Sequence, residues 1–175
     1  MLIGLAGICL PGLAARAEEA ESLAAQIKKI KTMPPSEFQQ SLPREPELDL
    51  AGFLSLKAQG PVVVLDVTSP EHFNARHLKG SVNLPLTELT EDTLPNIAPD
   101  KHVPVVLICE DTFFPVRMVA ATLQAYPVLK ASGYQNVQRL NLWHSSTDNK
   151  ILSQKAQERV LEFEGTGIVQ KAPKQ

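Results

Sequence analysis

Two continuous apolar runs stand out along the chain, at residues 62–67 (Val-Val-Val-Leu-Asp-Val) and residues 103–108 (Val-Pro-Val-Val-Leu-Ile). Runs of this kind are typical of strands that are buried on both faces of a parallel sheet. Pro104 fits such a strand only near its start, because proline has no N–H to donate to a neighbouring strand. A third strand is predicted at residues 137–140, and residues 80–85 predict a turn with a short strand.

Residues with helical spacing lie between and around these strands. Leu23, Ile27 and Ile30 form a narrow apolar stripe at i, i+4 and i+7, which predicts a helix with one buried face. Gly133 is a typical helix stop. A helix is also predicted after Cys109, with Val116, Val119, Ala120 and Leu123 on one face and an interruption at Pro127. The other predicted helices cover residues 18–31, 36–39, 48–58, 69–76 and 151–163, and residues 87–97 predict a short helix and a loop.

This order of strands and helices predicts an α/β fold in which an open parallel sheet is covered by helices on both faces. In such sheets, sites form at the carboxyl ends of the strands. Cys109 lies at such an end, between the second apolar run and the helix that follows it. The 175 residues, 43% of them hydrophobic, suffice for one domain with one core.

The first 17 residues look like a secretory signal peptide. Residues 2–15 are almost wholly apolar, but a membrane-spanning helix needs roughly 20 apolar residues. Ala15-Arg16-Ala17 is a small-x-small pattern that suits signal peptidase, so we expect cleavage and a periplasmic or secreted protein. No Lys or Arg precedes the apolar run, so either the signal is atypical or the true start lies upstream of Met1. The alternative is a hydrophobic N-terminus with no targeting role.

Cleavage would leave Cys109 as the single thiol, because Cys9 lies in the predicted signal. No internal disulfide forms in that case, and a lone thiol in an oxidising compartment either has a chemical role or is buried. Lipid attachment at Cys9 would need a small residue directly before the cysteine, and Ile8 stands there. The net charge of −2 and the lack of a basic run give little support to nucleic-acid binding or to a membrane-surface role.

Several segments resemble the rhodanese-like domain family. Residues 64–67 (VLDV), 69–73 (SPEHF) and 77–85 (HLKGSVNLP) are similar to its Asp-Val-Arg, Pro-Glu-x-Phe and His-Ile-x-Gly-Ala-x-Asn-x-Pro segments. Residues 105–109 (VVLIC) look like the strand that ends in its reactive cysteine, and residues 133–137 (GYQNV) look like its closing strand. The resemblance implies a rhodanese-like open parallel sheet flanked by helices, here with extra N- and C-terminal helices.

The resemblance implies a chemistry centred on Cys109. In rhodaneses the cysteine takes sulfur from a donor as a persulfide and passes it to a nucleophile. The implied partners are a small anionic sulfur species, such as thiosulfate, or a protein thiol, and no cofactor is implied. Backbone N–H groups of the loop and helix after the cysteine would stabilise the thiolate, which is the nucleophile. This chemistry requires a sulfur at the strand tip that faces N–H groups and can be reached by a substrate.

The loop after the cysteine departs from the family pattern, because it has no glycine to form a tight turn around the sulfur. A like charge near the sulfur also disfavours the thiolate, and two carboxylates adjoin it. The two phenylalanines are candidates for an apolar mouth, and the arginine either contacts a substrate anion or offsets the acidic pair. The residues concerned are Glu110, Asp111, Thr112, Phe113, Phe114, Pro115 and Arg117.

Each candidate also has a structural interpretation. Cys109 is alternatively a small buried hydrophobic residue, which is common for free cysteine, and the acidic pair is alternatively a solvated loop. Asp66 is expected to fix the neighbouring loop, and His77 to shape its turn by bonding to the backbone. His72 and His77 are five residues apart and share no helix face, so no metal site is predicted.

Three functions compete on this evidence. The leading hypothesis is sulfur transfer through Cys109, and the alternative is a catalytically degenerate rhodanese fold that binds or assembles with a partner protein of the cell envelope. Phosphatase chemistry needs an Arg six residues after the cysteine to bind phosphate, and Pro115 stands there. The predicted divisions are a signal peptide (1–17), an N-terminal helical extension (18–46), a rhodanese-like domain (47–144) and a C-terminal helix and tail (145–175).

Overall fold

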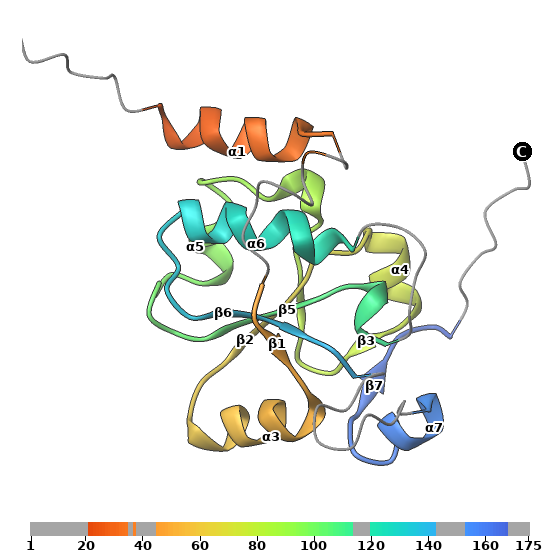
Figure 1. Ribbon diagram of the computed structural model, residues 1–175. Coiled ribbons are helices and arrows are strands. Elements are labelled where there is room, and N and C mark those ends of the chain that lie inside the picture. Colours follow the sequence, from red (N-terminus) through yellow and green to blue (C-terminus); the bar gives the residue numbers. More distant parts are fainter. Residues whose placement is uncertain (1–20, 35–36, 38–44, 114–119, 143–152, 168–175) are drawn as a thin grey trace, which may run out of the picture.

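The computed structural model describes residues 21–34, 37, 45–113, 120–142 and 153–167. Its centre is a five-stranded sheet in which every neighbouring pair is parallel, in the order β1-β6-β5-β2-β4 (Figure 1). This arrangement confirms the predicted α/β architecture. The strands are β1 (Glu47–Leu48), β2 (Val63–Asp66), β4 (Val82–Asn83), β5 (Val105–Ile108) and β6 (Val137–Leu140).

The two apolar runs form the central strands β2 and β5, as predicted. Their register places Asp66 beside Ile108, so both strands end at the same edge of the sheet. Successive side chains of a strand point to opposite faces, and Val106 and Leu107 of β5 accordingly belong to two separate buried clusters. Cys109, which follows β5 directly, therefore lies at the edge of the sheet where the sequence predicted the site.

Helices cover both faces of this sheet (Figure 1). Helix α3 contributes Phe53 to the cluster on one face, whereas α5 and α6 cover the other face. Helix α1 packs against α6 on the side away from the sheet and buries Ile27 of the predicted apolar stripe. In the described part of the chain, no helix has both the length and the apolar character needed to cross a membrane. The four helices are α1 (Leu23–Thr32), α3 (Leu50–Gln59), α5 (Leu94–Ile97) and α6 (Ala121–Ala131).

Local capping chemistry sets where two of the predicted helices begin. The helix expected from residue 48 begins at Leu50, because Leu48 belongs to β1 and Asp49 caps the helix by accepting from the Gly52 N–H at 2.8 Å. Ser69 caps α4 (Pro70–Ala75) as predicted. The helix expected over 36–39 lies outside the described residues, apart from residue 37.

Helix α6 runs through Pro127, so the prediction that this proline interrupts the helix was wrong. An interior proline removes a backbone hydrogen bond at a cost of about 3 kcal/mol. Pro127 is itself buried with its helical neighbours, and this tertiary packing offsets the local cost. The helix stops at the predicted Gly133, which has φ 89°. The predicted helical positions Val116 and Val119 lie outside the described residues.

The C-terminal region was predicted as one helix over 151–163, and that prediction was wrong where the chain is described. A four-residue helix is followed by an extended segment that pairs antiparallel with a strand after α4. The ring of Phe163 lies 3.9 Å from the Arg76 guanidinium carbon, and this long-range stacking favours the extended form over local helical spacing. The elements are β3 (His77–Leu78), α7 (Gln154–Gln157) and β7 (Phe163–Glu164).

The docking of α1 gives the first testable prediction. Ile27→Ala removes a side chain that is buried between α1 and the sheet-covering cluster, and such a truncation typically costs about 2–5 kcal/mol of unfolding free energy. Urea denaturation of the full chain measures this loss. Lys28→Ala on the exposed side of the same helix is the matched control, and an equal loss in both variants would contradict the docking.

Candidate functional site

Cys109 is enclosed: it belongs to the hydrophobic cluster on one face of the sheet, and its sulfur also meets polar groups. Cys109 follows β5 and opens the 3₁₀ turn η2 (Glu110–Thr112). Its N–H donates to Thr112 Oγ1 at 3.0 Å, and the Thr112 N–H donates to the Cys109 side chain. The sulfur also lies 4.0 Å from Oγ1 of Thr122, near the start of α6. Only 3% of Cys109 is exposed, so the sulfur faces N–H groups as expected but is not open to solvent.

Burial decides the protonation of this thiol. Desolvation raises the pKa of Cys109, and its hydrogen bonds with the backbone of Thr122 and Asp111 and with the Thr122 hydroxyl offset this only in part. The nearby charge of Asp111 raises the pKa further. The resting sulfur is therefore held mainly as a thiol, and the N–H groups around it become most valuable when negative charge develops.

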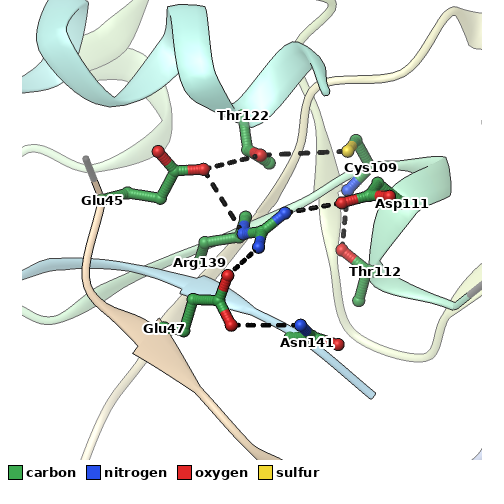
Figure 2. Close-up of polar contacts among 8 residues, drawn as sticks. All are labelled: Glu45, Glu47, Cys109, Asp111, Thr112, Thr122, Arg139 and Asn141. Atoms are coloured by element: carbon green, nitrogen blue, oxygen red, sulfur yellow. Dashed lines mark hydrogen bonds and ion pairs between the residues drawn. The ribbon is translucent and has the colours of Figure 1, made fainter. Parts of the chain in front are cut away.

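A cluster of three carboxylates around one guanidinium lies beside the sulfur (Figure 2). Arg139 of β6 donates from Nη1 to Asp111 Oδ2 at 2.6 Å and from Nη2 to Glu47 Oε1. Its Nε lies 3.3 Å from Glu45 Oε1, an ion pair without hydrogen-bond alignment. Asn141 Nδ2 completes the cluster by donating to Glu47 Oε2 at 3.1 Å.

Glu45 links this cluster to the cysteine. The Thr122 hydroxyl donates to Glu45 Oε1 at 3.3 Å, and the Cys109 thiol donates to the same hydroxyl oxygen. Glu45 is 6% exposed and Thr122 is fully buried. The second carboxyl oxygen of Glu45 is buried and has no hydrogen-bond partner among the described residues. The sulfur thus ends a buried chain of three side chains from three separate segments.

The charges in this cluster do not balance when every group is ionised. Desolvation raises the pKa of Glu45 and outweighs the attraction of Arg139. Burial acts to lower the pKa of Arg139, but Glu47, Glu45 and Asp111 together raise it. The guanidinium therefore stays charged, and Glu45, the most buried of the three acids, is the one driven toward its neutral form.

The acidic pair that follows the cysteine is divided between two partners. Asp111 points to Arg139, whereas Glu110 lies 3.1 Å from His72 Nε2 in an exposed side-chain contact. The solvated-loop interpretation thus describes Glu110 better than Asp111. Phe113 packs edge-on against Phe163 at 5.6 Å between ring centroids. Phe114, Pro115 and Arg117 lie outside the described residues.

Asp66 and His77 have the contacts expected of structural residues. Asp66 Oδ1 accepts from the Thr68 N–H at 2.9 Å and from its hydroxyl at 2.6 Å, which fixes the loop after β2. Burial raises the pKa of Asp66. His77 Nδ1 lies 2.7 Å from the Phe73 carbonyl and its ring stacks on that of Phe73. No group of three or more His, Cys, Asp or Glu among the described residues could hold a metal ion.

Sequence reasoning missed five residues of this site, namely Glu45, Glu47, Thr122, Arg139 and Asn141. Arg139 carries a detectable signal, because a charge inside a buried strand is expensive unless it is paired. Glu45 and Thr122 carry no such signal, because nothing in the neighbouring sequence distinguishes them from ordinary polar residues of a protein surface. Only the folded chain brings them together.

Comparison with known proteins decides the family. The family model for the rhodanese-like domain matches residues 50–142, which is more than half of the chain. The chain belongs to the rhodanese-like domain family. Cys109, Thr122 and Arg139 lie inside the matched region of this rhodanese-like protein, whereas Glu45 and Glu47 precede it. No curated protein matches the sequence.

A solved sulfurtransferase structure supports this family at the level of the fold. A thiosulfate sulfurtransferase from Pseudomonas aeruginosa matches at a TM-score of 0.50 and 17% identity, covering 69% of this chain and 20% of that one. The rhodanese-like domain of an Anabaena protein matches at 0.49 and 18%, covering 75% and 97%. A rhodanese with anions from E. coli matches at 0.43 and 21%, covering 61% and 100%.

The shared guanidinium gives the second prediction. Arg139→Ala leaves the buried carboxyl group of Glu45 and the partly buried one of Asp111 without their counter-ion, and breaking a buried pair typically costs about 3–5 kcal/mol of unfolding free energy. The loss should shrink at acidic pH, where the carboxylates become neutral. Chemical denaturation at several pH values measures it.

Lys79→Ala provides the control, because Lys79 pairs with Glu162 on the exposed surface and such pairs contribute little. A loss of stability at neutral pH no larger than that of Lys79→Ala would contradict the role given to Arg139.

Proposed function

We propose that this rhodanese-like protein transfers sulfane sulfur through a persulfide on Cys109. The observation that carries the proposal is the setting of the sulfur: it stands at the carboxyl end of β5 and receives hydrogen bonds from the backbone of η2 and of the first turn of α6. Aimed N–H groups at a helix N-terminus stabilise a negative sulfur. An apolar pocket would offer no such stabilisation.

The reaction that fits this setting has two displacement steps. The Cys109 thiolate attacks the outer sulfur of thiosulfate, a new S–S bond forms, and sulfite leaves with the electron pair of the bond that breaks. The persulfide anion formed on Cys109 then gives its outer sulfur to an acceptor thiolate, which regenerates the Cys109 thiolate. A protein persulfide can replace thiosulfate as the donor, in which case a thiolate is the leaving group.

The enclosure of Cys109 restricts this chemistry in two ways. A donor reaches the sulfur only when the residues around it move, because 3% of Cys109 is exposed at rest. The raised pKa also limits the thiolate available at neutral pH, so sulfur uptake should be slow and should accelerate as the pH rises. We further propose that the protein works in the periplasm or outside the cell, on the basis of the signal-like residues 1–17.

The same burial favours a second candidate function. A thiol that is enclosed and held protonated is what a non-catalytic rhodanese fold would retain, with its helices used to bind a partner in the cell envelope. Glu110 and Asp111 occupy positions where positive charge would assist catalysis, and this also fits a degenerate site. The two functions differ in whether Cys109 ever takes up sulfur.

Intact mass spectrometry separates the two functions. We expect incubation with thiosulfate or a persulfide donor to add about 32 Da, the mass of one sulfur atom, to the protein. The adduct should disappear in Cys109→Ala and persist in Cys9→Ser. Its yield in a fixed time should rise between pH 7 and pH 9, because more of the thiol is then ionised.

The controls decide the result. An adduct that persists in Cys109→Ala would place the sulfur on another residue and contradict the proposal. A protein that stays unmodified with every donor across this pH range would favour the binding function.

A further inference from the structure

We propose that Glu45 is a positioning residue of the cysteine site: it competes with Cys109 for the single hydroxyl proton of Thr122, so that the thiolate forms together with protonated Glu45. Glu45 precedes the family-matched region, and it reaches the site because the chain enters β1 immediately after it. The coupling meant here is between the protonation of Glu45 and the ionisation of Cys109. Its importance for catalysis rests on the proposed function, but the coupling itself does not.

The position of the Thr122 hydroxyl, between the sulfur of Cys109 and the carboxyl group of Glu45, carries the inference. The Cys109 thiol donates to Thr122 Oγ1 at 4.0 Å, and the Thr122 hydroxyl donates to Glu45 Oε1 at 3.3 Å. Figure 2 shows Thr122 between the sulfur and the carboxyl group. A hydroxyl has one proton to donate. While Glu45 is a carboxylate and receives that proton, the sulfur receives none from Thr122.

Proton accounting gives the coupled state. When the thiol ionises, its proton passes to Thr122 Oγ1, and the proton that Oγ1 held passes to Glu45 Oε1. The hydroxyl then donates to the thiolate and accepts from the carboxylic acid, so all three groups remain bonded. No net charge enters or leaves the buried cluster, which makes this route less costly than forming a second buried anion.

The surrounding charges oppose the simultaneous ionisation of both groups. Glu45 faces the cation of Arg139 from β6 and the carboxylate of Glu47 from β1. Cys109 faces the carboxylate of Asp111 from η2. Arg139, the cation that the described residues bring to this cluster, is already shared with Glu47 and Asp111. It therefore cannot neutralise a carboxylate on Glu45 and a thiolate on Cys109 together.

Two substitutions separate the contribution of the Glu45 carboxylate to the Cys109 pKa from that of the Thr122 hydroxyl. Glu45→Gln imitates the protonated acid, because its amide donates to Thr122 and leaves the hydroxyl proton for the sulfur. The Cys109 pKa should fall in this variant, which increases the thiolate fraction at neutral pH by about tenfold. Thr122→Val removes the hydroxyl, so the Cys109 pKa should rise and the effect of Glu45→Gln should largely vanish in the double variant.

The titration is measured on the full chain by NMR of the cysteine ¹³Cβ, with Cys9→Ser in every variant so that only Cys109 titrates. Thr122→Ser keeps the hydroxyl and should retain the wild-type curve. Glu47→Gln also removes a carboxylate from Arg139, but the Glu47 carboxylate bonds to Arg139 and Asn141, and its effect should be much smaller than that of Glu45→Gln. If the Glu45→Gln variant fails to fold, the comparison of Thr122→Val with Thr122→Ser still tests the proposal.

Sulfur uptake provides the functional readout. Glu45→Gln should accelerate persulfide formation at pH 7 by about threefold rather than tenfold, because a thiolate of lower pKa is a weaker nucleophile. A lowered Cys109 pKa without any sulfur adduct would sustain the coupling and reject the proposed function. A Cys109 pKa that is unchanged or raised in Glu45→Gln, or unchanged in Thr122→Val, would overturn the coupling whatever the sulfur assay shows.

Discussion

One guanidinium serves three carboxylates beside the cysteine, and the chemistry of the site depends on this imbalance. Arg139 holds Asp111, Glu47 and Glu45 around a single positive charge at the edge of the sheet. Buried ions are tolerated when they are paired, but one cation cannot pair fully with three anions. Glu45 is the carboxyl group most strongly driven toward its neutral form, because it is the most buried of the three acids and desolvation raises its pKa.

The same cluster explains why the acidic loop does not simply oppose a thiolate. Asp111 lies next to the cysteine in the sequence, and its charge raises the Cys109 pKa, but its side chain points to Arg139 and ties η2 to β6. The backbone of the same turn supplies an N–H group to the sulfur. Asp111, whose charge opposes a thiolate, thus also helps to build the surroundings on which the proposed persulfide would depend.

The scaffold could be predicted from the sequence because its signals are local. Uninterrupted valine-rich runs indicate buried parallel strands, and a cysteine directly after such a run must lie at the sheet edge where sites form. The predictions failed where distant contacts decide the outcome. Pro127 continues α6 because the helix is packed on the sheet, and Phe163 joins a strand because it stacks on Arg76. The contacts of Glu45 and Thr122 join residues 77 positions apart, and no local pattern announces them.

The most direct test of this account is the protonation of Glu45, followed through the ¹³C resonance of its carboxyl carbon as a function of pH. We predict that the acid form persists above the usual glutamate pKa of about 4.3, and that the resonance shifts again as Cys109 ionises. A single transition at or below the usual value, with no response to the thiol, would show that Arg139 neutralises Glu45 fully and would contradict the shared-proton site.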